Sequence, residues 1–587
     1  MSVSGIKFKA KKIVIVGGVA GGMSAAARAR RLSENSEIIV FERSGHVSYA
    51  NCGLPYFVGG EIQSQEQLIV VTPDALKNKL NLDIRVHHEV IKIDTRAKII
   101  SVKDTTTQKI SQEKYDELIL SVGAAPIRPN VPGIDLPGLF TLRSIEDIEV
   151  IQSWFEIQKP RTAVVAGGGF IGLEMAEQLV RRGLEVTLID SKDHVLAPLD
   201  IEMAEIVHDE LRKHGVKLIL GKSIKGFRAS GEVATITNNN PRSCWVLAGD
   251  HEPIPADLVI LGLGIRPDVE LARKAGLTIG ERGGIRVNEY LQSSDQNIWA
   301  VGDAIEVRNP INDSWTLIAL GGPANRQGRM VADNIFGAKE IYSGTIGTAI
   351  LRVFDLAVAS VGLNEEQLKS SNIPYEAINL HPSHHASYYP GAQRLDMKVL
   401  FRKETGVLLG AQVIGKEGVD KRIDVLATAI KAGMTMRDLA ELELAYAPPF
   451  GSAKDPINLA GMAGSNVLDG LTDQVQWHQV DALSASGALI IDVRTQKERE
   501  RGYIGGSLHI PLPELRRRVS EIPAGKEIVT YCQSGQRSYN ASRFLAQNGF
   551  SVRNLSGGYL TWSSKQFMNE NQEVLHQSKP KVSGVCT

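Results

Sequence analysis

The stretch KIVIVGGVAGGMSAAARARRLSENSEIIVFER, residues 12–43, predicts a nucleotide-binding βαβ unit. We expect a buried strand over 12–16, an Ala-rich helix over 23–32 and a second strand over 37–42. The glycines between the first strand and the helix let backbone amides approach a pyrophosphate, whose charge the helix N-terminus stabilises. Glu42, at the end of the second strand, is placed to bind a ribose hydroxyl.

The turn of this unit departs from G-x-G-x-x-G at one position, because Val19 stands where the second glycine is expected. The strand, the helix and the acidic residue still agree with the motif. The residues predicted to bind this first dinucleotide are Gly17, Gly18, Ala20, Gly21, Gly22 and Glu42.

The same pattern recurs over residues 162–190, with strands at 162–166 and 185–189 and a helix at 173–182. Its turn, GGGFIG, is a complete motif, which disfavours the alternative that this unit is a decayed duplication. Asp190 favours a free 2′-hydroxyl and therefore NADH over NADPH, although the nearby Lys192 weakens that preference. The predicted contacts are Gly167, Gly169, Gly172 and Asp190.

Two such units in one chain predict FAD together with a nicotinamide nucleotide. Three further stretches, YDELILSVG at 115–123, LVILGLGIRP at 258–267 and IWAVGDA at 298–304, resemble the two-dinucleotide-binding flavoprotein disulfide reductases. The resemblance implies an α/β fold in which two Rossmann-like domains are nested, the FAD domain being interrupted by the NAD domain. It also implies that Gly123 and Asp303 bind FAD.

Composition limits the other possibilities for this chain of 587 residues. Lys+Arg and Asp+Glu are equal at 66 each, so charge gives no reason to expect nucleic acid or a membrane as partner. The lysines before Ile13 superficially resemble a secretory signal, but the nucleotide site needs the residues that follow. The four cysteines show no C-x-x-C spacing, which favours reactive thiols of a cytoplasmic enzyme over a disulfide framework or zinc.

The run SYANCGLPY, residues 48–56, holds one cysteine where most reductases of this class have a pair. A single Cys52 cannot form an internal disulfide, so its oxidised form must be a mixed disulfide with a small thiol, a persulfide or a sulfenic acid. We expect Cys52 to begin a helix beside the flavin, with the helix N-terminus lowering the pKa of its thiol. The alternative is a buried structural cysteine.

This run resembles the coenzyme A-disulfide reductases, in which the cysteine carries coenzyme A as a mixed disulfide. Ser24, Arg28 and Arg31 share one face of the first predicted helix, a spacing that suits a phosphate-bearing ligand. The alternative for the two arginines is a solvated face. The positions that the resemblance implies for coenzyme A are Ser24, Arg28, Arg31, Ser48, Asn51 and Asn325.

A dimerisation domain is expected next, with two segments of interest at 381–391 and 444–456. The resemblance implies that Tyr388 and Tyr446 reach the active site of the partner subunit. A neutral phenol can donate a proton to a departing thiolate; the alternative is a pair of core or interface aromatics. His384 and His385 are adjacent, so we expect them to point apart and to bind no metal.

The C-terminal part resembles a rhodanese domain. A predicted strand, 527–531, runs directly into CQSGQR at 532–537, where a short loop surrounds the Cys532 sulfur with backbone amides and Arg537 adds positive charge. The loop is one residue shorter than that of protein phosphatases, which disfavours a phosphate substrate. The alternative is an inert binding module. Cys586 is expected to be an incidental exposed thiol rather than a sulfur relay.

The chain is therefore predicted to be a cytoplasmic, homodimeric flavoenzyme, with NADH as reductant and small thiols or persulfides as partners. We expect it to reduce coenzyme A disulfide, coenzyme A persulfide or polysulfide through a Cys52–coenzyme A mixed disulfide, with Cys532 passing sulfur. The first alternative is an NADH oxidase or peroxidase using a Cys52 sulfenic acid, and the second is a sulfur carrier with a redox-sensing flavin. The expected domains are FAD-binding at 10–125 and 256–335, NAD-binding at 126–255, dimerisation at 336–465, rhodanese at 475–565 and a mobile tail at 566–587.

Overall fold

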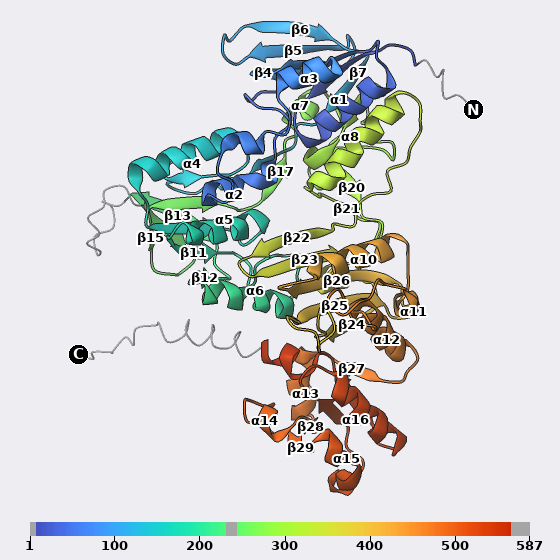
Figure 1. Ribbon diagram of the computed structural model, residues 1–587. Coiled ribbons are helices and arrows are strands. Elements are labelled where there is room, and N and C mark those ends of the chain that lie inside the picture. The colour runs from blue at the N-terminus through green and yellow to red at the C-terminus, as the bar shows by residue number, and fades with distance from the viewer. Residues whose placement is uncertain (1–7, 230–243, 565–587) are drawn as a thin grey trace, which may run out of the picture. The chain divides into compact units, whose positions relative to one another are not determined.

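The computed structural model describes residues 8–229 and 244–564, so the predicted tail and Cys586 lie outside the described residues. The chain divides into two compact units. The first holds the described residues up to Asp193 and those between Gly215 and Gly347, and the second holds His194–His214 and the described residues from Thr348 on. Figure 1 labels the elements of both units.

The first unit opens with a parallel five-stranded sheet in the order β19-β7-β1-β2-β3. Its strands are β1 (Lys12–Val16), β2 (Glu37–Phe41), β3 (Asp83–Arg85), β7 (Glu117–Leu120) and β19 (Ile298–Ala300). Strand β1 is a continuous Ile/Val run because a central parallel strand is buried on both faces. Helices α1 (Ala20–Leu32) and α8 (Gly321–Ile335) pack against each other (Figure 1).

A second parallel sheet, in the order β12-β11-β10-β16-β9, lies in the chain between β7 and β19. Its strands are β9 (Leu139–Phe140), β10 (Thr162–Ala166), β11 (Glu185–Ile189), β12 (Lys217–Ile219) and β16 (Leu258–Leu261). Along the sequence, the last strand of the first sheet therefore follows all the strands of the second sheet. The predicted nesting of one dinucleotide-binding fold inside the other is confirmed.

The second unit contains an antiparallel sheet in the order β22-β23-β26-β25-β24, which leaves β24 at one edge. Its strands are β22 (Ala349–Val353), β23 (Leu356–Gly362), β24 (Tyr375–Leu380), β25 (Leu395–Arg402) and β26 (Leu408–Gly415). Helices α6 (Ile201–Lys213) and α10 (Val419–Lys431) pack on this sheet, and α12 (Pro456–Leu468) contacts β24.

The same unit ends in a parallel sheet of order β27-β31-β30-β28-β29. Its strands are β27 (Asp473–Val475), β28 (Leu489–Asp492), β29 (Leu508–His509), β30 (Ile528–Tyr531) and β31 (Val552–Leu555). Helix α16 (Gln536–Gln547) packs on β30 and β31. Cys532 therefore leaves the sheet at the carboxyl end of β30, where α/β folds place their ligand sites.

Both helices of the dinucleotide units start three residues earlier than predicted. Helix α1 begins at Ala20 rather than Met23, and α5 (Phe170–Arg181) begins at Phe170 rather than Leu173. The last residues of each glycine-rich turn are already helical, which aims their amides at the place of a bound phosphate. Among the described residues, no helix is long and apolar enough to cross a membrane.

Candidate active site

Cys52 lies in a single 3₁₀ turn, η1 (Asn51–Gly53), that leads into the short helix α2 (Leu54–Gly59). Helix α2 is held in place by packing against α5 and against α4 (Ile145–Gln158). Cys52 itself is exposed, whereas Leu54 and Pro55 are buried and fix the turn below it. The thiol is therefore accessible but rigidly placed, as a nucleophile requires.

The electrostatics around Cys52 correct one prediction. Although the residue is exposed, surrounding protein atoms partly desolvate the thiol and so raise its pKa, the carboxylates of Glu174 and Asp303 raise it further, and a backbone hydrogen bond opposes them. The expected lowering by a helix N-terminus is wrong for the chain alone, because α2 has only six residues and two acidic groups face the thiol.

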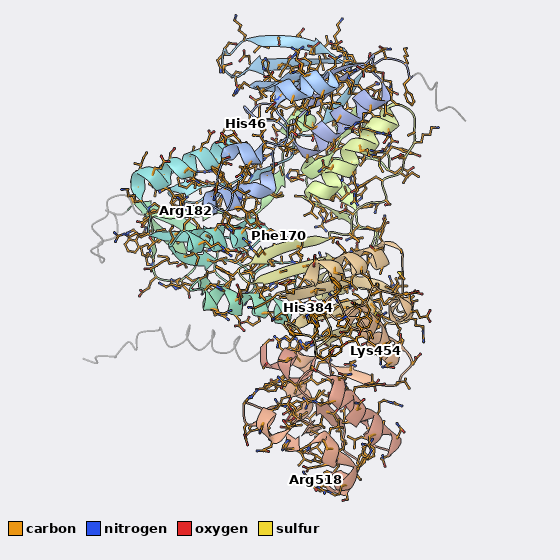
Figure 2. The ribbon with its side chains drawn as sticks, viewed as in Figure 1. His46, Phe170, Arg182, His384, Lys454 and Arg518 are labelled. Atoms are coloured by element: carbon orange, nitrogen blue, oxygen red, sulfur yellow. The ribbon has the colours of Figure 1, made fainter. Side chains whose placement is uncertain are left out.

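Glu174 is a site residue that the sequence reasoning missed. It lies on α5, and its carboxylate accepts a hydrogen bond of 3.2 Å from the hydroxyl of Tyr56 on α2. Figure 2 labels Phe170, the first residue of α5, and Arg182, which directly follows the helix. A signal existed, since an acidic residue two positions after the last glycine of the motif lies one turn into the helix that carries the nucleotide.

The glycines of the first glycine-rich turn leave no room for side chains. Gly17 has φ +102°, and a Cβ there would lie 2.2 Å from the carbonyl oxygen of Ser121. A Cβ on Gly22 would lie 1.9 Å from the carbonyl oxygen of Gly17. The buried Glu42 carboxylate accepts the Gly18 amide at 2.8 Å, which holds the turn against the end of β2. This cradle fits the pyrophosphate and ribose of a dinucleotide.

Ala20 and Gly21 supply the first residues of α1, and Gly21 lies so close to Val301 that a Cβ would be 2.9 Å from its side chain. The carboxylate of Asp303 lies in the adjoining turn, and burial raises its pKa. Among the described residues, no group is recorded as a hydrogen-bond donor to this carboxylate. A half-buried acceptor of this kind fits the ribityl hydroxyls of FAD.

Gly123 is the remaining predicted flavin contact. It has φ +72°, and a Cβ would lie 2.8 Å from the guanidinium of Arg143. That guanidinium donates to the carbonyl of Val122 at 3.2 Å, and burial lowers its pKa. Arg143 also acts on the carboxyl of Asp303, whose pKa it lowers against the effect of burial. A glycine is required here because the chain turns in the left-handed region against a fixed cation.

The second glycine-rich turn repeats these features. Gly167 has φ +109°, with a hypothetical Cβ 2.1 Å from the carbonyl oxygen of Gly262, and a Cβ on Gly172 would lie 1.9 Å from the Gly167 oxygen. A Cβ on Gly169, by contrast, would meet nothing within 4 Å. Asp190 accepts the Gly168 amide at 2.5 Å. The open space above Gly169 fits the pyrophosphate of a nicotinamide nucleotide.

The positions predicted for coenzyme A divide into two groups. Ser24 and Arg28 reach across from α1 to α8: the Ser24 hydroxyl lies 2.6 Å from Oδ1 of Asn325, and the Arg28 guanidinium pairs with Asp333 at 2.6 Å. Arg31 is exposed on the same helix. Ser24 and Asn325, which the sequence separates by 301 residues, are thus brought together.

The other two positions, Ser48 and Asn51, lie in the Cys52 loop. Ser48 has φ +50°, and its amide donates to the Gly18 carbonyl at 2.8 Å, which links this loop to the first glycine-rich turn. Asn51 is exposed beside Cys52. Strain in the left-handed region is costly for a non-glycine residue and is typical of functional loops.

Tyr388 and Tyr446 are brought together in the second unit. Their hydroxyl oxygens lie 3.1 Å apart, and their exposed fractions are 74% and 48%. The hydrogen bond between the two hydroxyls raises the pKa of Tyr388. Side chains exposed to this degree are not core aromatics, so the core half of the alternative is wrong, whereas the interface half stays a prediction. Paired phenols on an open surface are suited to meet a partner subunit.

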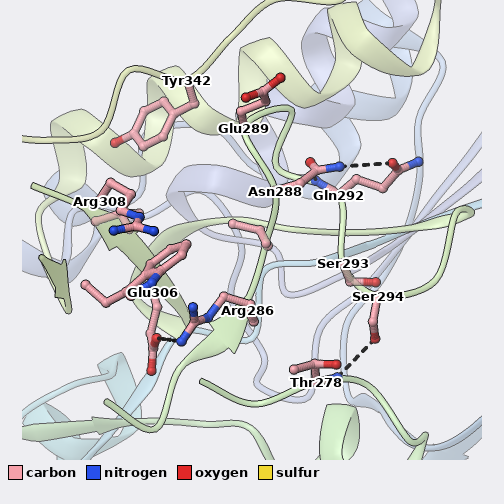
Figure 3. A pocket seen from close by; sticks show the side chains of 13 residues that line it. Thr278, Arg286, Asn288, Glu289, Gln292, Ser293, Ser294, Glu306, Arg308 and Tyr342 are labelled. Atoms are coloured by element: carbon pink, nitrogen blue, oxygen red, sulfur yellow. Dashed lines mark hydrogen bonds and ion pairs between the residues drawn. The ribbon is translucent and has the colours of Figure 1, made fainter. Parts of the chain in front are cut away.

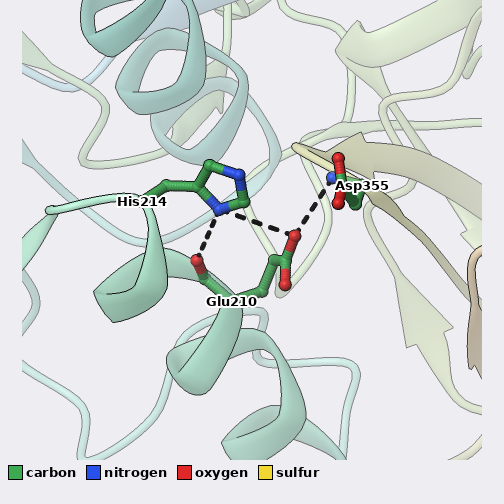
Figure 4. Close-up of side chains that lie close together, drawn as sticks. All are labelled: Glu210, His214 and Asp355. Carbon is green, nitrogen blue, oxygen red and sulfur yellow. Dashed lines mark hydrogen bonds and ion pairs between the residues drawn. The ribbon is translucent and has the colours of Figure 1, made fainter.

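The two adjacent histidines do not point apart. The rings of His384, which Figure 2 labels, and His385 lie 4.1 Å from centroid to centroid. Burial lowers the pKa of His384. A different cluster, Glu210, His214 and Asp355, has ligand-type atoms within 4.8 Å of one another (Figure 4). Two lysines already pair with its carboxylates: Lys416 lies 2.9 Å from Asp355, and Lys213 lies 3.3 Å from Glu210.

Cys532 lies at the bottom of a backbone cradle. Its residue is completely buried, the Gly535 amide donates to Sγ at 3.1 Å, and the Ser538 hydroxyl donates to Sγ at 3.5 Å. Gly535 has φ +92° and caps helix α16. Donors converging at the start of a helix stabilise a sulfur anion, as the sequence predicts.

Arg537 does not act as the free positive charge that we expected. Its guanidinium donates to both oxygens of Glu498, at 2.8 and 2.5 Å. This pairing lowers the pKa of Glu498 to about 2 and raises that of Arg537. Arg537 also interacts electrostatically with Cys532, so it lies beside the cradle, but Glu498 neutralises most of its charge.

A separate hollow of about 530 Å³ lies in the first unit (Figure 3). Arg286 pairs with the buried Glu306 at 3.0 Å, and the guanidinium groups of Arg286 and Arg308 lie 3.8 and 4.4 Å from the ring of Trp315. None of the predicted site residues lines this hollow. Arg286 and Glu306 pair with each other, although Nε of Arg286 and Oε2 of Glu306 have no hydrogen-bond partner among the described residues, and we assign the hollow no ligand.

Two nested dinucleotide-binding folds, with one accessible cysteine beside the first, define a flavin- and nicotinamide-dependent disulfide reductase. The family description "Pyridine nucleotide-disulphide oxidoreductase" matches residues 11–328, and its dimerisation domain matches residues 348–455. A rhodanese-like domain matches residues 476–565. The chain belongs to the pyridine nucleotide-disulphide oxidoreductase family and carries a C-terminal rhodanese-like domain.

Among individual proteins, the chain is 34% identical to a coenzyme A disulfide reductase of Staphylococcus haemolyticus, over 77% of this chain and 98% of that protein. It is 34% identical to an NADH oxidase of Methanocaldococcus jannaschii, over 76% of this chain and 97% of that protein. It is 35% identical to a CoA-dependent NAD(P)H sulfur oxidoreductase of Pyrococcus abyssi, over 76% of this chain and 96% of that protein.

Two solved structures resemble almost the whole chain. The reduced CoADR-RHD of Bacillus anthracis is 47% identical, with a TM-score of 0.92 over 95% of this chain and 98% of its own. An NAD-dependent persulfide reductase from A. fulgidus is 37% identical, with a TM-score of 0.86 over 94% of this chain and 100% of its own. Both similarities extend past the reductase part into the C-terminal domain, since they cover more than nine-tenths of the chain.

Proposed function

We propose that this protein uses NADH to reduce coenzyme A disulfide, coenzyme A persulfide or polysulfide through a mixed disulfide between Cys52 and coenzyme A. The observation that carries the proposal is a single accessible Cys52 beside a flavin-type cradle, with no second cysteine in the first unit's described residues except the buried Cys244. The similarity to a coenzyme A disulfide reductase and to a persulfide reductase supports the same chemistry.

The chain's residues would divide the work as follows. The first glycine-rich turn and Asp303 would hold FAD, which would supply an electron pair to the Cys52 mixed disulfide, and the second turn would hold the NADH that provides this pair. The Cys52 thiolate attacks coenzyme A persulfide at its inner sulfur, which forms the mixed disulfide and releases HS⁻. Two electrons and one proton then restore the Cys52 thiolate and free the coenzyme A thiol. With coenzyme A disulfide, the leaving group is a coenzyme A thiolate instead.

Tyr388 and Tyr446 would supply that proton. Their hydroxyls already share a hydrogen bond, so one phenol donates while the other stabilises the developing charge. We infer that they act on the active site of a partner subunit in a homodimer, which the dimerisation-domain match supports. Ser24, Arg28, Arg31, Ser48, Asn51 and Asn325 would bind coenzyme A.

The rhodanese domain would supply the coenzyme A persulfide for this reaction. The Cys532 thiolate takes one sulfane sulfur and one proton from solution while the shortened polysulfide anion leaves, giving a Cys532 persulfide. A coenzyme A thiolate then takes the outer sulfur with its proton, which regenerates the Cys532 thiolate and gives coenzyme A persulfide. Since Cys52 and Cys532 must both return to thiolates, we place the protein in the reducing cytoplasm.

The test is the intact mass of the denatured, unreduced polypeptide. The expected result is an added mass of one coenzyme A, located on the Cys52 peptide and released by dithiothreitol. A Cys52→Ser protein is the control and must lack the adduct. A sulfenic acid at Cys52, with no coenzyme A adduct, would overturn the proposal.

That second outcome belongs to the alternative function, an NADH oxidase or peroxidase. The similarity to an archaeal NADH oxidase, of the same 34% identity, favours keeping it as a second candidate. A single cysteine serves peroxide chemistry equally well through a sulfenic acid. Rapid consumption of peroxide without any need for coenzyme A would support it, whereas dependence of NADH oxidation on coenzyme A disulfide supports the first function.

A further inference from the structure

The rhodanese domain and the dimerisation sheet belong to one compact unit, and they meet along the edge strand β24. The Asn379 amide of this strand donates to the Ser556 hydroxyl at 2.9 Å, and the Ala377 carbonyl accepts from the Gln476 side chain at 2.8 Å. Both strand groups would otherwise be unpaired at the sheet edge. Asn379 and Ser556 are 4% and 3% exposed, so the contact excludes water.

The first residue after β24 forms the centre of this contact. His381 lies between two partners: its Nδ1 is 2.5 Å from the Asp396 carboxylate and its Nε2 is 2.9 Å from the Thr561 hydroxyl. Because Asp396 accepts the proton at Nδ1, the neutral ring has a free acceptor at Nε2, to which Thr561 donates. The arrangement has the residue types of a hydrolytic triad, but Asp396 and Thr561 are each only 5% exposed. His381 and Thr561 come from opposite sides of the contact between the two domains, so we assign the group a structural role as a clamp.

The clamped segment, residues 556–561, is also one wall of the Cys532 cradle. The Tyr559 amide donates to the Cys532 carbonyl at 2.8 Å, and the Leu560 amide donates to the Gln533 carbonyl at 3.0 Å. A Cβ on Gly558 would lie 2.5 Å from the Cys532 carbonyl oxygen. The segment therefore has the persulfide loop on one side and β24 with His381 on the other.

On its other side, the clamp is continuous with the tyrosine loop. His381 begins the run that leads to Tyr388, and the amide of Ala386 within that run donates to the Gly451 carbonyl at 2.9 Å. The run is therefore tied to the loop that carries Tyr446. One short stretch of chain connects the residue that clamps the sulfur cradle with the phenols proposed to act at the active site.

We propose that His381 is a positioning residue, which, with Thr561 and Ser556, docks the Cys532 cradle on β24 so that sulfur passes from a seated rhodanese domain. This inference rests on the proposed sulfur route from Cys532 to coenzyme A. A rhodanese domain that diffused freely on its linker would need no such buried contacts. A seated one presents the persulfide from a fixed direction, and orientation of this kind raises the rate of a transfer between two groups.

The experiment uses the full-length holoenzyme and three assays. The first is NADH-dependent reduction of polysulfide with catalytic coenzyme A, which needs both cysteines. The second is NADH-dependent reduction of coenzyme A disulfide, which needs Cys52 alone. The third is sulfur transfer from thiosulfate to cyanide, which needs Cys532 alone. A domain-docking role affects the first assay and leaves the other two unchanged.

We expect the double variant Ser556→Ala/Thr561→Val to lose roughly tenfold in the polysulfide assay, because two buried hydrogen bonds across the contact are removed. The coenzyme A disulfide assay should stay within about twofold, and because this pair lies in the wall of the Cys532 cradle, the thiosulfate assay is judged on the His381 variants instead. In a Cys532→Ser background the double variant should cause no further loss. The matched control is Ser563→Ala, whose hydroxyl donates at 3.0 Å to the Leu560 carbonyl inside the rhodanese domain, and it should change none of the assays.

Substitutions on the opposite side of the contact keep the test independent of the rhodanese fold. His381→Ala should reproduce the loss, and His381→Gln, which can still reach Thr561, should restore most of it. If these variants keep the wild-type polysulfide rate while Cys532→Ser abolishes it, the docking role is overturned but the sulfur route still stands. A parallel loss in the thiosulfate assay would overturn it too, by placing the damage inside the cradle. A Cys532→Ser protein with full polysulfide activity would overturn the sulfur route itself.

Discussion

At Cys52, the groups that face the thiol decide when it becomes a nucleophile. The Glu174 carboxylate is one cause of the raised pKa of Cys52, after burial. A Glu174→Gln variant should therefore lower the pKa of Cys52, because a neutral amide no longer opposes the thiolate. The measurement is the rate of Cys52 alkylation by iodoacetamide as a function of pH, which should rise at lower pH in the variant.

The matched control for that variant is Glu156→Gln, on the exposed face of α4. It removes the same charge from the same unit without facing the thiol, so its alkylation profile should coincide with that of the wild type. A Glu174→Gln profile that also coincided with the wild type would mean that burial alone sets the pKa of Cys52.

Individual residues show where sequence reasoning ends. Cys52 and Cys532 can be identified from their own loops, and the amide that donates to the Cys532 sulfur comes from Gly535 in the same loop. Glu174 and the Glu498 partner of Arg537 cannot, because each arrives from a distant part of the chain; Glu498 is separated from Arg537 by 39 residues. Charges that depend on such pairings, including the pKa of Cys52, are set by tertiary structure.

At the scale of elements, two glycines of the second glycine-rich turn have different roles, one in stabilising the fold and the other in binding the nucleotide. Gly167→Ala places a Cβ 2.1 Å from a carbonyl oxygen at φ +109°, so we expect a lower melting temperature, with a cost of about 1–3 kcal/mol from the backbone alone. Gly169→Ala adds its Cβ to open space. It should leave the melting temperature unchanged and raise the KM for NADH, because the pyrophosphate needs that space.

Thermal unfolding and steady-state kinetics of the two variants check this prediction together. A Gly169→Ala protein with unchanged KM for NADH would contradict the assignment of the second turn to the nicotinamide nucleotide. A melting temperature that fell equally in both variants would contradict the distinction between the two glycines.

The strands of both dinucleotide units follow from periodicity alone. Strands 12–16, 162–166 and 185–189 are observed at the predicted bounds, because each is a β-branched run closed by a glycine or an acidic residue. The helices were predicted three residues late, since glycines weaken a helical pattern although tertiary contacts make them helical here. The docking of the C-terminal domain on β24 left no periodic signal, since it depends on a few polar side chains.

At the scale of the whole molecule, one buried cation ties α6 to the antiparallel sheet. Lys398 is completely buried, and its ammonium lies 2.8, 2.5 and 2.6 Å from Asp200, Glu202 and Glu365. Although burial opposes it, Lys398 lowers the pKa of Glu365 to about 2. The pairing of Glu365 therefore stabilises the fold above the ordinary pKa of about 4.5, and this contribution is lost as the pH falls towards 2.

Lys398→Met should lower the free energy of unfolding by about 3–5 kcal/mol at pH 7, because the buried Asp200 and Glu202, together with Glu365, lose their shared ammonium. The loss should be smaller at pH 5, which is nearer the ordinary pKa of about 4.5 for the Glu365 carboxyl. Urea unfolding at both pH values measures it. The control is Lys369→Met, whose exposed ammonium also pairs with Glu365 and should contribute about 0–1 kcal/mol. Equal losses at both pH values would contradict the electrostatic origin.

The capped edge strand β24 has a consequence for how the protein is made. Asn379 and Ser556 are separated by 177 residues, so at about 5–20 residues per second the ribosome needs roughly 10 to 35 s to deliver the partner of this edge. Throughout that interval the nascent chain exposes unpaired strand groups to other chains on the same polysome. We expect a message truncated before the C-terminal domain to yield protein that associates through β24. Translation of the complete chain removes this risk after roughly 10 to 35 s.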